Sequence, residues 1–234
     1  MQELREFSTI QVIAVMALPL VLAIVLHEIA HGYMAFLKGD NTAKLMGRLT
    51  LNPVRHIDPF GTVLMPLLFF YSTGMLFAFA KPVPVNFMNL HRPKEDMVWV
   101  AAAGPLINFI LAVLSALALK VIGIFSSNVN LYIEFINQRL MPPEYSPIIF
   151  PLVGMFYFSV ILNVVLAVIN LIPIPPAYGG RIVVGLLPQR ESDIYAGIES
   201  VGLILIIAVL MFNPFGITHG VIWPIIETIV GLLI

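Results

Sequence analysis

Two histidines and a glutamate stand at a spacing that suits metal-dependent hydrolysis, in the motif HEIAH of residues 27–31. Residues four positions apart lie on the same face of a helix, so His27 and His31 can bind one metal ion. Glu28 lies beside them, where it can take a proton from an activated water. Zinc suits such a site, because protein ligands hold it and leave one position for water. We therefore predict Zn²⁺ as the cofactor, His27 and His31 as ligands and Glu28 as the general base.

The motif lies at an unusual place, inside the apolar run of residues 10–37. Crossing a hydrocarbon core of ~30 Å takes about 20 helical residues, and this run is long enough. Ionisable side chains are costly at that depth and indicate a functional site. An embedded metal site would suit a hydrolase whose substrate is itself a membrane segment.

The composition excludes several classes of protein. Of the 234 residues, 59% are hydrophobic and 11% are charged, whereas a soluble domain carries about a quarter charged residues. The formal net charge of −1 offers no electrostatic basis for binding nucleic acid, which we exclude as a partner. The chain has no cysteine, which rules out disulfides and thiolate zinc sites. These features indicate a protein that lies in the lipid bilayer.

Apolar runs predict an all-α polytopic membrane protein of five to six transmembrane helices, with a re-entrant or β-strand segment near the active site. We expect one membrane-embedded domain over residues 1–234, with a core at about 10–188 and a C-terminal helical hairpin at about 196–234. Residues 60–80 either span the membrane or enter and leave it as a hairpin. Alternation in residues 82–87 predicts an extended strand with edge-type prolines. The runs are residues 10–37, 60–80, 97–124, 148–172, 196–212 and 217–234.

Basic residues predict the orientation in the membrane. If residues 60–80 do not change sides, nine of the twelve lysines and arginines fall on one face, which is then the cytosolic one. If residues 60–80 cross, this bias becomes much weaker. We favour the re-entrant alternative, and we expect a multi-pass protein of the plasma membrane of a prokaryote.

Further motifs follow HEIAH in a fixed order, and together they make the interpretation specific. With them, the chain resembles the site-2 protease family of intramembrane zinc metalloproteases, in its short form without a PDZ domain. The resemblance covers about residues 25–188. The motifs are GRLTLNPVRHIDPFGT at 47–62, AKPVPVN at 80–86, AAAGPLIN at 101–108 and NLIPIPPAYGGR at 170–181.

The resemblance implies a three-helix catalytic core that cleaves transmembrane segments of substrate proteins within the bilayer. By motif match, Asn170 would hydrogen-bond the substrate backbone or the oxyanion. Asn108 would lie in the core near the metal-bearing helix and is a candidate for the same task. The alternative for both asparagines is hydrogen bonding between helices. Gly104 and Pro105 match positions where helices pack closely or kink.

One position departs from the family pattern. The third zinc ligand of the family is an aspartate, and the alignment of the surrounding prolines and glycines places Tyr178 there. Tyr178 could ligate zinc as a phenolate. Alternatively, Asp40 or Asp58 could supply the carboxylate. Lastly, the site could hold the metal poorly, because two imidazoles without an anionic partner bind zinc more weakly.

These observations leave two rivals to an intramembrane protease. The first is a catalytically inactive relative that binds membrane helices without cleaving them, which differs from the protease only at the third ligand. The second is a transporter or channel that uses the histidines as a metal pathway. A transporter predicts polar residues along several spans, whereas here they cluster at one site, so we rank it last.

Overall fold

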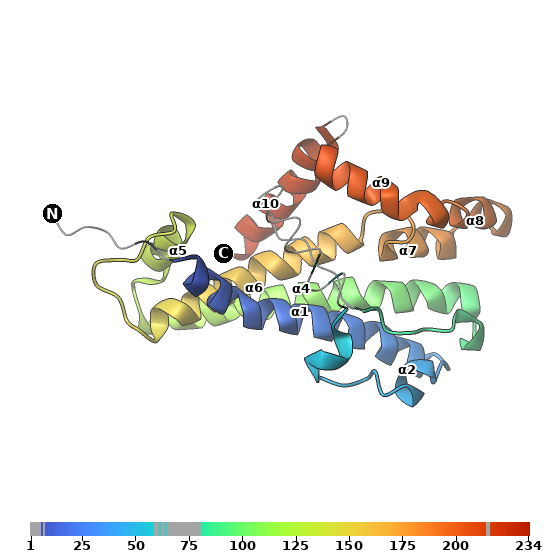
Figure 1. Cartoon of the computed structure of the whole chain (residues 1–234), viewed down its shortest axis with the longest axis horizontal. Coiled ribbons are helices and arrows are strands. Elements are labelled where there is room, and N and C mark those ends of the chain that lie inside the picture. Colours follow the sequence, from blue (N-terminus) through green and yellow to red (C-terminus); the bar gives the residue numbers. More distant parts are fainter. Residues whose placement is uncertain (1–5, 7, 59–60, 62–63, 65–80, 214–215) are drawn as a thin grey trace. The chain divides into compact units, whose positions relative to one another are not determined.

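The computed structural model describes residues 6, 8–58, 61, 64, 81–213 and 216–234 of the chain. Helices dominate this part, and it contains no β-ladder beyond an isolated bridge between Glu6 and Leu140. The predicted all-α class is therefore confirmed. The helices follow one another in the order shown in Figure 1.

Three helices are long and apolar enough to cross a membrane: α1 (Thr9–Leu37), α4 (Pro93–Phe125) and α6 (Ile149–Asn170). They contain 29, 33 and 22 residues, and about 20 suffice to span the hydrocarbon core. They coincide with three of the predicted apolar runs. A fourth predicted segment, residues 60–80, lies outside the described residues except for positions 61 and 64.

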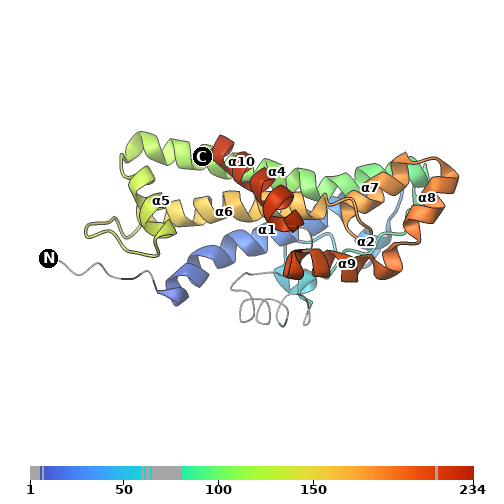
Figure 2. The same ribbon diagram turned by 90° about the horizontal axis from the view of Figure 1, so that it is seen from above.

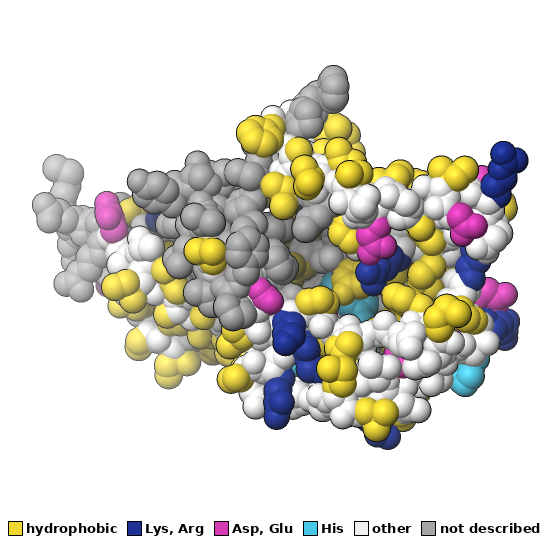
Figure 3. Space-filling view, turned by 45° about the vertical axis from the view of Figure 1, so that its right-hand side comes forward, with side chains coloured by type: hydrophobic (Ala, Val, Ile, Leu, Met, Phe, Trp, Pro, Cys, Tyr) yellow, Lys and Arg dark blue, Asp and Glu magenta, His cyan; other side chains and the backbone are white. Residues whose placement is uncertain are grey.

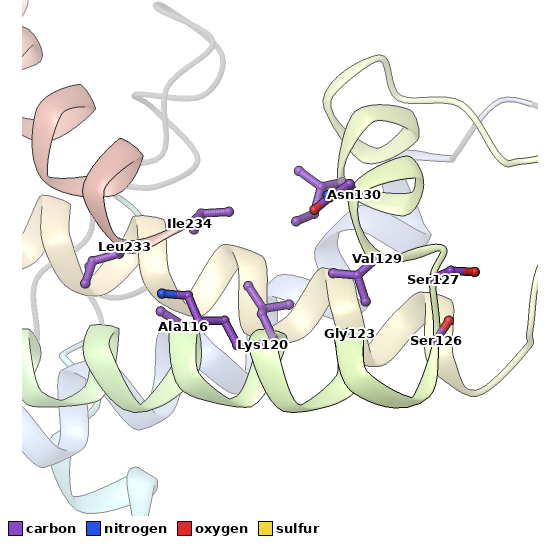
Figure 4. A pocket seen from close by; sticks show the side chains of 11 residues that line it. Ala116, Lys120, Gly123, Ser126, Ser127, Val129, Asn130, Leu233 and Ile234 are labelled. Carbon is purple, nitrogen blue, oxygen red and sulfur yellow. The ribbon is translucent and has the colours of Figure 1, made fainter.

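The chain folds as two compact units, and the three long helices contribute to both. The first unit comprises residues 1–23, 109–165 and 226–234. It contains α5 (Val129–Asn137) together with parts of α1, α4 and α6. Ser115 of α4 and Ser159 of α6 share a hydrogen bond of 2.7 Å between their hydroxyl oxygens. A cavity of about 160 Å³ in this unit lies beside Lys120 of α4 and Asn130 of α5 (Figure 4).

The second unit comprises residues 24–108 and 166–225 and holds every predicted site residue. After α1 the chain makes the short helices α2 (Thr42–Leu45), η1 (Pro53–His56) and η3 (Phe87–Asn89). After α6 come α7 (Tyr178–Leu186), α8 (Gln189–Ala196) and α9 (Glu199–Phe212). The hydroxyl of Ser192 donates to the carbonyl of Val184 at 2.8 Å, which holds α8 against α7 (Figure 2).

Ion pairs of the second unit join its surface segments. Lys38, just after α1, pairs with Asp96 of α4 at 3.0 Å, and Arg181 of α7 pairs with Glu199 of α9 at 3.2 Å. Basic and acidic side chains consequently lie close together on the face shown in Figure 3. The first pair ties the end of α1 to the start of α4, and these two helices carry His27, Glu28, His31 and Asn108 of the predicted site.

The predicted strand at residues 82–87 is not part of a sheet within the described residues. Pro82 and Pro84 lack an N–H group and cannot donate to a ladder. Other groups of the segment bind side chains instead, and Phe87 already begins η3. At the C-terminus, α9 is followed by η5 (Thr218–Ile222) and α10 (Trp223–Leu233), so the helices predicted there form. Their packing as a hairpin stays a prediction.

Candidate metal centre

The helix α1 presents the three residues of the HEIAH motif to the protein interior. His27, Glu28 and His31 are 5%, 7% and 1% exposed. The Nε2 atoms of the two histidines lie 3.0 Å apart. Tetrahedral zinc with Zn–N bonds of 2.0–2.1 Å holds two nitrogens about 3.3 Å apart. The helix therefore brings the two ring nitrogens to the separation that a shared metal ion needs.

The other ring nitrogens determine the tautomers of the two histidines. The Nδ1–H of His27 donates to the side-chain oxygen of Asn108, and the Nδ1–H of His31 donates to the carbonyl of Val100 at 2.6 Å. Both acceptors belong to α4. Because each imidazole carries its proton on Nδ1, both Nε2 atoms direct lone pairs toward each other. Two such lone pairs repel unless a cation lies between them, and metal-bound histidines are oriented by second hydrogen bonds of this kind.

Gly104 explains how α4 approaches so closely. A Cβ atom built on this glycine would overlap Nε2 of His31 and lie 2.7 Å from Cε1 of His27. Only glycine leaves this space, so the AGPLIN motif contributes both an open position and the asparagine that orients His27. The predicted close packing at Gly104 agrees with this geometry. The histidine pair and its surroundings fit a zinc ion.

Glu28 is held by a segment distant in the chain. Its Oε2 atom accepts a hydrogen bond of 2.7 Å from the backbone N–H of Val83. Arg48 donates from its Nη2 atom to the carbonyl of Lys81 at 2.7 Å and to that of Pro82 at 3.4 Å. Sequence reasoning missed Val83, Val100 and Arg48 as site residues. The sequence predicts a strand around residue 83, but the alternation of a strand does not show which distant side chain its backbone groups contact.

Tyr178, at the start of α7, lies against the histidine pair. Its ring stacks on that of His31, with centroids 3.7 Å apart and an interplanar angle of 24°, and lies 5.4 Å from that of His27. Burial, followed by the negative charge of Glu28, raises the pKa of the Tyr178 phenol above its ordinary value. Without a metal ion beside it the phenol is neutral, and a neutral phenol is a weak ligand for zinc.

The two alternative carboxylates lie elsewhere. Within the described part of the chain, no group of three His, Asp or Glu residues is placed to hold a metal ion. Asp40 is fully buried and accepts from Thr42, Asn86 and Asn89 at 2.5–3.1 Å. Burial acts to raise the pKa of Asp40, but these hydrogen bonds outweigh it and lower the pKa. Asp58 accepts from the N–H of Gly61 at 2.7 Å.

The two predicted asparagines differ in their surroundings. Asn108 is fully buried and its side-chain oxygen faces His27, so its observed contact orients a ligand rather than a substrate. Its predicted role toward the substrate or the oxyanion stays a prediction. Asn170 ends α6 and donates from Nδ2 to the carbonyl of Leu166 at 2.8 Å. Its predicted contact with substrate stays a prediction.

A family model and two curated relatives match the chain. The model of peptidase family M50 matches residues 15–212. The chain is 33% identical over 220 residues to the "Putative zinc metalloprotease YwhC" of Bacillus subtilis (strain 168), covering 91% of this chain and 85% of that protein.

The chain is also similar to the "Putative zinc metalloprotease Rip2" of Mycolicibacterium smegmatis, with 29% identity over 112 residues that cover 47% of this chain and 42% of that protein. No solved structure matches significantly. The resemblance inferred from the motifs is confirmed, since the family match extends over the long apolar helices and the histidine pair alike. The chain belongs to peptidase family M50, the metalloendopeptidases of the site-2 protease type.

Proposed function

We propose that the protein hydrolyses a peptide bond within a transmembrane helix of another membrane protein, using zinc bound by His27 and His31. The observation that carries the proposal is the convergence of two Nε2 lone pairs at 3.0 Å, beside a buried glutamate on an apolar helix. When bound, zinc supplies a Lewis acid that polarises the scissile carbonyl. A multi-pass location in the plasma membrane of a prokaryote belongs to the same proposal.

The side chains around the metal divide the remaining tasks. Asn108 and the Val100 carbonyl keep both imidazoles in the tautomer that can bind a cation. Glu28 has one oxygen engaged by Val83, which orients the carboxylate, while the other can accept a proton from the attacking water and pass it to the leaving amine. Burial excludes bulk water and strengthens these electrostatic interactions.

A substrate helix must unwind before cleavage, because its carbonyls are engaged in internal hydrogen bonds. The segment of residues 81–86 lies outside any helix, and its Val83 contacts Glu28. Its backbone offers groups on which an unwound peptide can bind. We propose that the peptide lies along this segment, with Asn170 contacting the substrate backbone or the oxyanion.

One observation favours a second candidate function. Tyr178 occupies the position of the expected third ligand, and its ring stacks on His31 as a neutral phenol. A site with two neutral ligands would hold zinc weakly. The second candidate is therefore a relative that binds membrane helices without cleaving them.

The substitution Glu28→Gln distinguishes the two candidates. Glutamine keeps an oxygen that can accept from Val83 but has no base, so zinc binding should be retained while cleavage falls by at least about a hundredfold. The assay measures zinc content and cleavage of a transmembrane reporter in proteoliposomes. Cleavage by the Glu28→Gln protein at the wild-type rate would refute the protease mechanism. Weak zinc binding by the wild-type protein, with binding of the transmembrane reporter but no cleavage, would support the second candidate.

A further inference from the structure

Arg48 is buried in a way that calls for an explanation. Its side chain is only 7% exposed, and no carboxylate of the described residues lies within ion-pair distance. Removing a cation from water is costly when no carboxylate binds it directly. Its Nε atom is also buried without a hydrogen-bond partner among those residues. The protein therefore maintains a guanidinium here at an energetic cost.

The local backbone directs Arg48 to this place. After α2 the chain turns through Gly47 with a positive φ of 62°, a conformation that glycine adopts without strain. The N–H of Arg48 then donates to the carbonyl of Ala43 at 2.9 Å, which fixes the residue at the end of the turn. From there its guanidinium reaches residues 81 and 82, more than thirty positions further along the chain.

The contacts of Arg48 lead to Glu28 through a short path. Its Nη2 atom holds the carbonyls of Lys81 and Pro82, the two residues that precede Val83. The N–H of Val83 donates to Oε2 of Glu28 at 2.7 Å. Since prolines occupy both neighbouring positions, 82 and 84, Val83 has the only N–H of residues 82–84. The position of this single donor depends on how the two carbonyls before it are held.

Packing on α1 supports the same arrangement. Gly32 lies one turn after Glu28 on the same face of α1. A Cβ atom on Gly32 would lie 2.7 Å from Cγ1 of Val83, so the valine side chain packs directly on the helix backbone. Val83 is thereby buried against α1 on one side, while Arg48 binds the chain just before it.

We propose that Arg48 is a positioning residue: by binding the carbonyls of Lys81 and Pro82, it holds the N–H of Val83 on Glu28 and thus orients the general base. This inference rests on the proposed function for its effect on catalysis. Its structural part, the dependence of residues 81–83 on Arg48, does not.

The structural part is tested with a cysteine reporter, because the chain has no native cysteine. Val83→Cys is introduced into the otherwise unchanged full chain in proteoliposomes, and its rate of reaction with a thiol reagent is measured. Arg48→Met should raise this rate about tenfold to a hundredfold, the range that loss of a charge-assisted hydrogen bond produces. Arg48→Lys keeps a cationic donor and should lie in between. The control is Arg55→Met, which changes an exposed arginine of η1 and should leave the rate unchanged.

The catalytic part is tested without the reporter cysteine. Arg48→Met should lower kcat for a transmembrane reporter at least about tenfold with KM and zinc content unchanged, since an orienting contact acts on the chemical step. Arg48→Lys should restore part of the loss. If Arg48→Met loses zinc and protein yield together with cleavage, the residue serves the fold alone and the inference is wrong.

Different results would overturn the role of Arg48 and the protease function. Wild-type labelling and wild-type kcat in Arg48→Met, while Glu28→Gln is inactive, would overturn the role of Arg48 and leave the protease function standing. Full cleavage by Glu28→Gln would overturn the protease function, and the labelling rates would still decide whether Arg48 holds the segment.

Discussion

Replacing Tyr178 with aspartate should convert a two-histidine site into one with three protein ligands. The tyrosine ring stacks on His31 with centroids 3.7 Å apart and lies 5.4 Å from the ring of His27. The oxygens of an aspartate reach about as far from the backbone as the centre of a tyrosine ring. A carboxylate at this position would therefore lie beside the converging Nε2 atoms, where a cation between them could bind it.

The gain in zinc affinity is the difference between the attraction of the carboxylate to the metal and the cost of burying that carboxylate. A carboxylate about 4 Å from a divalent cation gains about 8 kcal/mol at an effective dielectric constant of 20. Partial burial of the carboxylate offsets much of this gain, which leaves about 1.5–3 kcal/mol, as for other charge-assisted contacts. Zinc affinity should rise about tenfold to a hundredfold, since 1.4 kcal/mol corresponds to tenfold. Loss of the stacked ring should cost the zinc-free fold about 0.5–1.5 kcal/mol.

The assay is a competition titration of zinc against a chromophoric chelator, followed by cleavage of a transmembrane reporter. Tyr178→Asn is the matched control, because it has the shape of aspartate without its charge, and it should not gain affinity. Tyr178→Phe removes only the hydroxyl and should bind zinc like the wild type. A wild-type protein that already holds one tight zinc, with weaker binding in Tyr178→Phe and no gain in Tyr178→Asp, would show that the phenol is a competent ligand and refute the reasoning.

Two further substitutions test a contact of the metal centre and a buried carboxylate outside it. Gly104→Ala should lower zinc content at least about tenfold, because its Cβ would overlap His31 and overpacking costs about 1–3 kcal/mol. The control is Gly123→Ala in the same helix, where a Cβ meets nothing, and its zinc content should match the wild type. Equal zinc content in the two variants would contradict the close approach of α4 to the histidines. Asp40→Asn should lower thermal stability at neutral pH. Because the folded protein lowers the pKa of Asp40, its ionised form stabilises the fold above the ordinary value of about 4. The stability difference between wild type and variant in detergent should thus be constant from about pH 5 to 7 and shrink as the pH falls below about 4, and a difference that grows toward low pH would contradict the argument.

Local sequence determines the helices of this protein and the pairing of its histidines. A run of about 20 apolar residues has few alternatives to a membrane helix, because its backbone must be hydrogen-bonded internally in lipid. His27 and His31 are four positions apart, and the helical period alone predicts that they share one face of a helix. The order of the motifs after HEIAH is also visible in the sequence alone. The family it predicts is confirmed by the family match over residues 15–212.

Only the tertiary structure decided what surrounds these residues. Asn108 is 81 positions from His27 and Val83 is 55 from Glu28, so no local period connects them. The carbonyl of Val100 contacts His31 as a backbone group that any residue would carry, and therefore leaves no trace in the sequence. Residues 82–87 have the alternation of a strand, yet their groups bind the side chains of α1 and its following loop, because prolines remove the donors that a ladder requires. Helical period and hydropathy act over a few residues, whereas the orientation of a metal ligand depends on which distant groups the packed helices bring within hydrogen-bonding distance.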